Sequence, residues 1–170
     1  MNQKKKTAAI LFNSLYAIVL FLFFTDWYTC VEIKSEPLKS FAYWGLLAGT
    51  PLTIASNAIL FRKGLKKGIA LTIPALVALF IYTKDPMFIL IRKGSWKTQF
   101  IAYQNKNSTN STIEFQMKDI GAFGYAKRYV KAYRLASLLI IAEQVDFKPE
   151  NNTGWIKVDK EVNELELKYP

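Results

Sequence analysis

The chain has 170 residues, a formal net charge of +10 and no histidine, and 51% of its residues are hydrophobic. Histidine is the commonest metal ligand and general base, and it completes Ser-His and Cys-His nucleophile pairs, so its absence argues against hydrolases and metalloenzymes. The single cysteine, Cys30, excludes an internal disulfide. We therefore expect neither a metal nor another cofactor.

Three stretches without a charged residue fill the first half of the chain: residues 7–25, 41–61 and 68–83, of 19, 21 and 16 residues. A helix rises about 1.5 Å per residue, so about 20 residues cross a hydrocarbon core of about 30 Å. The first two stretches fit a bilayer directly, and the third fits if flanking lysines snorkel. The stretches predict a transmembrane module over residues 1–84, with spans at about these positions.

The topology depends on the first and third stretches. The first looks like a signal peptide but has no small-x-small cleavage site, so we interpret it as an uncleaved anchor. Lys4, Lys5 and Lys6 precede it and predict a cytoplasmic N-terminus. Three full crossings then place the C-terminal half on the outer face, whereas a re-entrant third segment would leave it in the cytoplasm. The composition favours a bacterial plasma (inner) membrane, with the C-terminal domain in the periplasm.

A few small and polar residues lie inside the apolar stretches. Gly45 and Gly49 form a small-xxx-small pattern, which lets another helix approach closely, from the same chain, a second copy or a different subunit. Asn13 and Asn57 predict a hydrogen bond between helices. No charged residue lies within the three stretches, which argues against a self-contained transporter.

Residues 85–170 predict a small β-rich domain. Asp85-Pro86 ends the third helix, and beyond it the hydrophobic pattern changes to period two, most clearly at Ile113, Phe115 and Met117. We expect the charged tail after Asp159 to be loosely held. The predicted fold class is α+β: a three-helix transmembrane module followed by a mostly antiparallel sheet of about five strands. Its candidate segments are 87–92, 96–104, 112–118, 127–135, 138–145 and 154–158, with a hairpin joining the second and third.

Four basic residues lie close together in this half: Lys127, Arg128, Lys131 and Arg134. On a strand, Arg128 and Arg134 share one face, and the two lysines share the other. The group is a solvated face, a contact for lipid headgroups or a contact for an acidic partner protein. No aromatic RNA-binding motif or zinc ligand set accompanies it, so we expect no nucleic-acid partner.

The missing histidine, the uncharged spans and the small domain together predict a function without catalysis. We expect an accessory subunit or binding partner of a larger membrane or envelope complex, in contact with the lipid bilayer and with a protein partner or a second copy. One alternative is a protective membrane protein of the toxin-immunity type. Another is a lipid-binding protein or membrane enzyme that uses carboxylates. Its candidate acids are Asp85, Glu114 and Asp119, with Tyr125 or Lys127 nearby.

Overall fold

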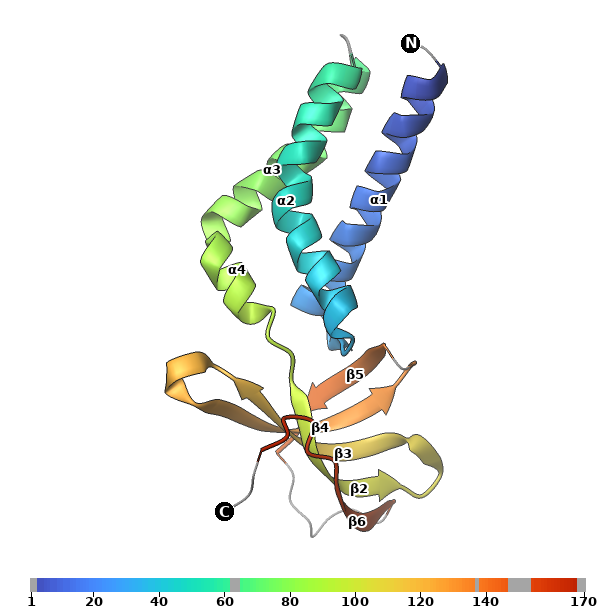
Figure 1. Cartoon of the computed structure of the whole chain (residues 1–170). Coiled ribbons are helices and arrows are strands. Elements are labelled where there is room, and N and C mark those ends of the chain that lie inside the picture. The colour runs from blue at the N-terminus through green and yellow to red at the C-terminus, as the bar shows by residue number, and fades with distance from the viewer. Residues whose placement is uncertain (1–2, 62–64, 137, 147–153, 168–170) are drawn as a thin grey trace. The chain divides into compact units, whose positions relative to one another are not determined.

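The computed structural model describes residues 3–61, 65–136, 138–146 and 154–167 (Figure 1). The chain divides into two compact units. The helical unit comprises Met1–Trp27 and Pro37–Lys93, and the sheet unit comprises Tyr28–Glu36 and Gly94–Pro170. The predicted α+β class is confirmed, with helices in the first unit and an antiparallel sheet in the second.

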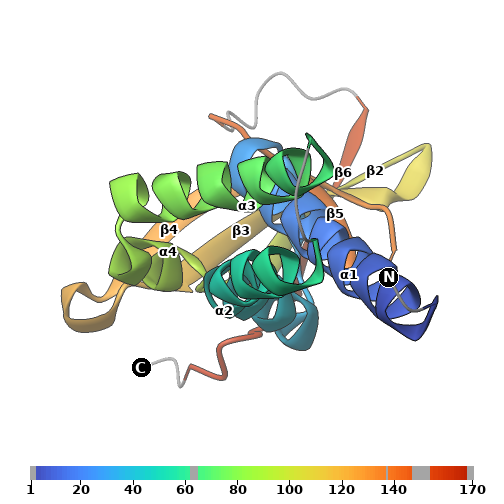
Figure 2. The same cartoon turned by 90° about the horizontal axis from the view of Figure 1, so that it is seen from above.

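The helical unit contains α1 (Gln3–Tyr28), α2 (Glu36–Leu60), α3 (Leu65–Lys84) and the short α4 (Pro86–Arg92). Figures 1 and 2 show the three long helices as neighbours in one bundle. Among the described residues, two helices are long and apolar enough to cross a membrane, α1 over Thr7–Tyr28 and α3 over Lys67–Lys84. Helix α2 is not among these candidate spans, so the predicted module of three transmembrane helices is confirmed only for two of them as candidates.

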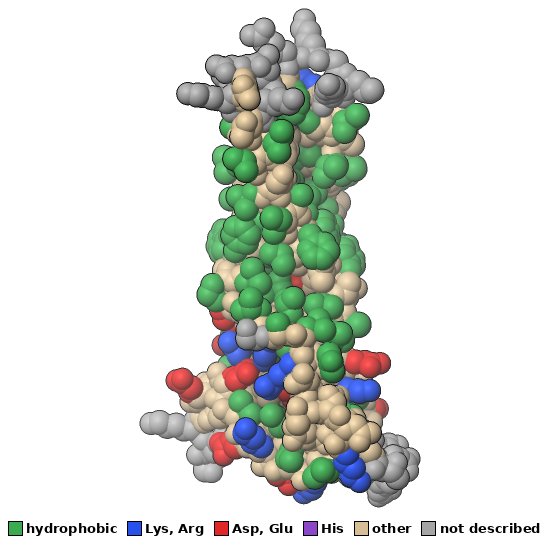
Figure 3. Space-filling model, turned by 90° about the vertical axis from the view of Figure 1, so that its right-hand side faces the viewer, with side chains coloured by type: hydrophobic (Ala, Val, Ile, Leu, Met, Phe, Trp, Pro, Cys, Tyr) green, Lys and Arg blue, Asp and Glu red, His purple; other side chains and the backbone are tan. Residues whose placement is uncertain are grey.

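The polar side chains of α2 are directed into the bundle. Thr50, Thr53 and Asn57 are fully or almost fully buried. The Thr50 hydroxyl lies 2.8 Å from the Tyr16 hydroxyl of α1, and the Thr53 hydroxyl donates to the Gly49 carbonyl at 2.7 Å. The outer surface of the unit is correspondingly apolar, as the many hydrophobic side chains along the helices in Figure 3 show. A bundle with this distribution of side chains is suited to lipid on the outside.

A charged pair occupies the ends of α1 and α2. The Lys39 ammonium lies 3.4 Å from the Asp26 carboxylate, and both side chains are almost completely buried. The Tyr43 hydroxyl donates to the same carboxylate at 2.8 Å. The uncharged stretches gave no sign of this pair, because α1 extends beyond the first stretch and α2 begins before the second. A buried charge requires such partners, since desolvation of an isolated ion is costly.

Residues 87–92 form α4, so the predicted strand at this position is wrong. The Asp85 carboxylate accepts a hydrogen bond from the Met87 amide at 2.8 Å, and Pro86 occupies the first turn. Aspartate at the N-cap followed by proline is a strong helix start, because it satisfies a free amide and fixes φ. The local cap therefore outweighs the β-branched content of this short segment.

The sheet unit contains six strands in the order β1-β5-β4-β3-β2-β6, and every neighbouring pair is antiparallel. The predicted hairpin is present as β2 and β3, although β3 begins earlier than expected and absorbs most of the predicted turn. The strand bounds are β1 Val31–Ile33, β2 Lys97–Asn105, β3 Ser108–Asp119, β4 Tyr125–Arg134, β5 Leu139–Gln144 and β6 Trp155–Glu161. The unexpected strand is β1, which belongs to the connection between α1 and α2.

The two sides of the sheet differ in chemistry. The network face carries the polar side chains of β3 and the partners opposite them on β2 and β4, such as Gln116 with Thr98 and Arg128. It also carries a small apolar cluster, made of Val130, Ala132, Ile140 and Ala142. The aromatic face carries Phe100, Phe115 and Tyr129, whose ring centroids lie 5.1–6.2 Å apart. Alternation along β3 separates the two faces, as the sequence predicts.

The C-terminal tail is held more firmly than the sequence predicts. Strand β6 continues to Glu161, and the amides of Val162 and Asn163 both donate to the Gln99 carbonyl at 2.9 Å. The Glu164 amide then donates to the Thr98 carbonyl at 3.0 Å. The expectation of a loose tail after Asp159 is therefore wrong as far as Glu164.

Candidate functional site

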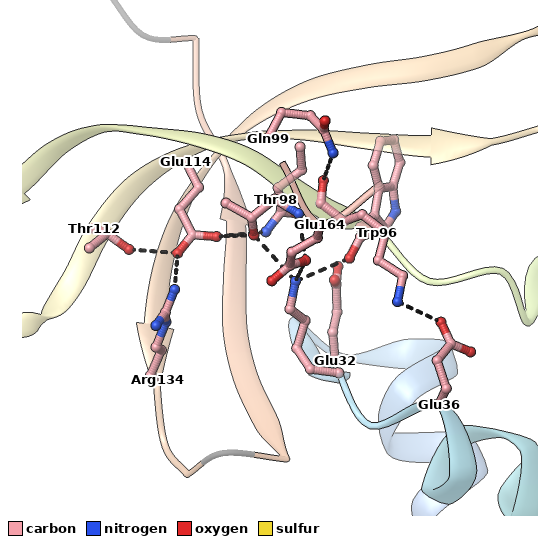
Figure 4. Close-up of polar contacts among 12 residues, drawn as sticks. Glu32, Glu36, Trp96, Thr98, Gln99, Thr112, Glu114, Arg134 and Glu164 are labelled. Atoms are coloured by element: carbon pink, nitrogen blue, oxygen red, sulfur yellow. Dashed lines mark hydrogen bonds and ion pairs between the residues drawn. The ribbon is translucent and has the colours of Figure 1, made fainter. Parts of the chain in front are cut away.

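The network face of the sheet centres on Glu114, the middle residue of β3. Its side chain is only 1% exposed, although it carries a carboxylate. Hydroxyls of Thr98 and Thr112 donate to it at 2.7 and 2.8 Å, and the Gln116 amide donates at 3.1 Å. The Arg134 guanidinium completes the set at 3.2 Å (Figure 4). Donors from three strands thus satisfy one buried carboxylate.

This environment determines the protonation state of Glu114. Burial raises the pKa of its carboxyl, because a charged form is less well solvated inside the protein. The hydrogen bonds from Thr98, Gln116 and Thr112 and the positive charge of Arg134 outweigh burial, so the pKa lies below its ordinary value. Glu114 is consequently ionised at neutral pH and poorly suited to donate a proton.

Arg128 forms a second cluster on the same face, next to Gln116. Its guanidinium contacts both carboxylate oxygens of Glu32 at 2.7 Å and the Gln116 carbonyl oxygen at 2.7 Å. It also stacks over the Trp96 ring, with 4.0 Å from its central carbon to the ring centroid. Because Glu32 belongs to β1 and Arg128 to β4, this cluster joins strands that are not neighbours in the sheet.

A cleft of about 540 Å³ opens beside these clusters. Its lining includes the basic side chains Lys34, Lys97 and Arg134 together with Glu164. The Lys34 ammonium lies 2.8 Å from the Glu164 carboxylate, which also accepts a hydrogen bond from the Thr98 amide at 2.7 Å. Glu164, a residue of the C-terminal tail, thus lines the cleft, and Figure 4 shows its side chain among these contacts.

The charges around the cleft are balanced pair by pair. Lys34 pairs with Glu164, Lys97 lies 3.1 Å from Glu36, and Arg134 pairs with Glu114. Buried polar atoms normally have partners. Within the described residues, two buried side-chain atoms lack a hydrogen bond: the side-chain amide oxygen of Gln99 and the hydroxyl of Ser95. The cleft is therefore polar, and the three basic side chains that line it are each paired with a glutamate.

The four basic residues singled out in the sequence separate into two pairs. Arg128 and Arg134 lie on the network face, where each contacts a glutamate. Lys127 and Lys131 lie on the aromatic face, are exposed, and form no ion pair with the described residues. They alternate with three exposed or half-exposed tyrosines of β4, Tyr125, Tyr129 and Tyr133. The lysines are thus exposed without a charged partner among the described residues, whereas Arg134 is half exposed and paired with Glu114.

The helix-packing residues lie in the core of the bundle. A Cβ on Gly45 would come within 2.8 Å of Val19 Cγ2, and one on Gly49 within 3.4 Å of Tyr16 Cδ2. The structure therefore places the two glycines against α1. Asn13 and Asn57 exchange two hydrogen bonds at 3.0 and 3.1 Å.

The three candidate acids do not converge on one site. Asp85 caps α4, Asp119 accepts a hydrogen bond from the Gly121 amide at 2.7 Å, and Glu114 is buried in its network. Sequence reasoning missed Glu32, Trp96 and Glu164. No local signal marks them, because their partners lie far along the chain, 96 residues away in the case of Glu32 and Arg128.

No group of three or more metal-ligating side chains is found in the described part of the chain. In comparisons with known proteins, no family model matches the chain, and neither does any curated protein or solved structure. The function must therefore be inferred from this chain alone.

Proposed function

We propose that this chain is an integral membrane protein of the bacterial plasma membrane that crosses it three times, holds the sheet unit at the outer face and acts without catalysis. Its role is that of an accessory subunit or binding partner of a larger membrane complex. The proposal rests mainly on β1, because this strand connects the two parts of the chain in a way that restricts the topology.

Strand β1 lies between α1 and α2 in the chain and pairs with β5, whose other neighbour is β4 in the C-terminal half. Strands that share hydrogen bonds lie on the same side of a membrane. The chain must therefore cross the bilayer an even number of times between Glu36 and Gly94. If α3 crosses, α2 must cross as well, and with α1 this makes three crossings. A third segment that only re-enters the bilayer is disfavoured by the same count.

The polar residues of α2 are compatible with a span because they bond inside the bundle. The Asn57 amide donates to Asn13 and to the Ala70 carbonyl, at 3.1 and 2.8 Å. The Thr50 hydroxyl donates to the Leu46 carbonyl at 2.6 Å. Polar groups with internal partners are tolerated in a membrane, whereas unpaired groups facing lipid are costly.

The absence of catalysis is supported by the positions of the acids. Asp85 and Asp119 stabilise a helix start and a turn, and Glu114 is held ionised by its neighbours. A general acid usually needs a pKa near the working pH and access to a substrate. A buried carboxylate with a lowered pKa provides neither, and this favours stoichiometric binding over membrane enzymology.

The topology can be tested with a protease-cleavable tag at the C-terminus in intact spheroplasts. Cleavage from outside is the expected result, and cleavage only after lysis would refute the outer-face placement. Binding is tested by mild solubilisation of native membranes followed by native mass spectrometry. We expect the chain in a complex of fixed stoichiometry with another protein, and recovery solely as a free monomer would contradict the proposed role.

A further inference from the structure

The turn between β3 and β4 is an apolar tip that its own backbone holds closed. The Ile120 amide donates to the Gly124 carbonyl, and the Gly124 amide donates to the Gly121 carbonyl, both at 3.0 Å. Gly121 and Gly124 have φ of 69° and 84°, which few other residues adopt without strain. These bonds give the turn a defined shape without help from packing.

Phe123 projects from this tip with 88% of its side chain exposed, the highest value among the described large hydrophobic residues. Ile120 and Tyr125 beside it are also exposed. No heavy atom from elsewhere lies within 4 Å of where a Cβ would stand on Gly121 or Gly124. The tip is therefore uncovered on the side of its glycines. The closed turn directs the phenyl ring of Phe123 outward.

The turn between β4 and β5 presents a second apolar tip. Leu135 and Leu138 are each about half exposed, at 51% and 47%. The Leu135 amide donates to the Leu139 carbonyl at 3.2 Å. The turn between β2 and β3 differs, because its exposed residues are polar, Lys106 and Asn107. Two turns of the sheet thus carry exposed apolar side chains, and Ile156 and Val158 on strand β6 are exposed as well.

Both apolar tips adjoin the places where the chain connects to its helices. Lys97, four residues after the end of the helical unit at Lys93, pairs with Met117 just before the first tip. The Lys34 amide, two residues before α2 begins, donates to the Leu138 carbonyl of the second tip at 2.9 Å. Each tip thus lies beside a segment through which the sheet unit is joined to a helix in the chain.

We propose that the tips at Phe123 and at Leu135 and Leu138 insert into the headgroup region of the bilayer that holds the helices. This inference rests on the proposed membrane integration of the chain. Apolar and aromatic side chains flanked by basic ones favour this zone, because the rings leave water while lysine and arginine meet anionic phosphates. Lys118 and Lys127 flank the first tip, and Arg134 precedes the second. The apolar tips thus contact lipid, and these contacts hold the sheet at the membrane in addition to the covalent connections to the helices.

The test uses the purified full-length chain in vesicles of phosphatidylethanolamine and phosphatidylglycerol. Cys30 is replaced by serine, and a single cysteine labelled with the environment-sensitive fluorophore NBD is placed at Phe123 or, as the matched control, at Asn107. Lipids with a nitroxide near the headgroup should quench the label at position 123 and shift its emission to the blue, while iodide should quench mainly the label at position 107. Equal behaviour at the two positions would overturn the inference. So would protection from iodide without quenching by the nitroxide lipid, which indicates cover by a second copy.

A second reporter keeps Phe123 in place. With the label at Leu135→Cys, the additional change Phe123→Asp should reduce quenching by the nitroxide lipid, whereas Asn107→Asp should not. No difference between the two changes would contradict a shared insertion of the tips. Alkaline carbonate extraction separates the two proposals: release of the chain refutes membrane integration itself, while a retained chain without lipid contact at position 123 refutes only the tips.

Discussion

Arg128→Ala is expected to destabilise the sheet unit by about 3 kcal/mol, because removing one partner of a buried ion pair costs about 3–5 kcal/mol. We take the lower end of this range because the paired side chains of Arg128 and Glu32 are still 11% and 17% exposed to solvent. The contact of Arg128 with the Trp96 ring adds about 0.5–2 kcal/mol at most. The substitution should weaken mainly the binding of β1 to the sheet, because this edge strand has β5 as its one neighbouring strand.

The assay is urea unfolding of the full chain in mild detergent, followed by tryptophan fluorescence. Lys127→Ala is the matched control, because this neighbouring exposed lysine lies on the other face, and its loss should change stability by less than about 0.5 kcal/mol. The stability of Arg128→Lys should lie between those of Arg128→Ala and Lys127→Ala, since lysine keeps the charge but loses the bidentate geometry. A double-mutant cycle with Glu32→Gln should give a coupling of about 1 kcal/mol or more. Equal stability of Arg128→Ala and Lys127→Ala would refute the reasoning.

Three further predictions concern the Glu114 network and the packing of the helices. Because the pKa of Glu114 is lowered in the folded chain, its contribution to stability is present above the ordinary carboxyl pKa of about 4.3 and is lost as the pH falls through the folded value. Glu114→Gln should therefore lower the urea midpoint at pH 7 and reduce the fall of that midpoint as the pH is lowered. The same fall of the midpoint in acid for the variant and the original chain would contradict this. Gly68→Ala should raise the melting temperature through a gain of up to about 1 kcal/mol in helix propensity. Gly45→Ala should not, because its Cβ would lie 2.8 Å from Val19 Cγ2, and equal gains at both sites would exclude close packing there. Asn57→Leu should cost about 1–2 kcal/mol in thermal unfolding, because it leaves partners on α1 and α3 unpaired, and a neutral result would count against the buried network.

The sequence predicts those elements whose signal is local. The uncharged stretches locate all three long helices, and alternation at Ile113, Phe115 and Met117 predicts strand β3 and its two faces. The same local evidence misread residues 87–92, because hydrophobic content and a helix cap indicated different structures and the cap prevailed. The predicted hydrogen bond between Asn13 and Asn57 is confirmed, but the sequence did not indicate that Asn57 also donates to the Ala70 carbonyl of α3.

Contacts between distant residues were decided by the tertiary structure alone. Strand β1 has only three residues, too few for a periodic pattern, and it becomes a strand because β5 offers it backbone partners. Glu32 meets Arg128 across 96 positions, and Lys34 meets Glu164 across 130. Composition records that these charges exist, but not which of them pair, since pairing depends on the register of strands that are distant in the chain. The proposed membrane topology and the balanced cleft both rest on that register, while local periodicity alone predicts the helices and the faces of the sheet.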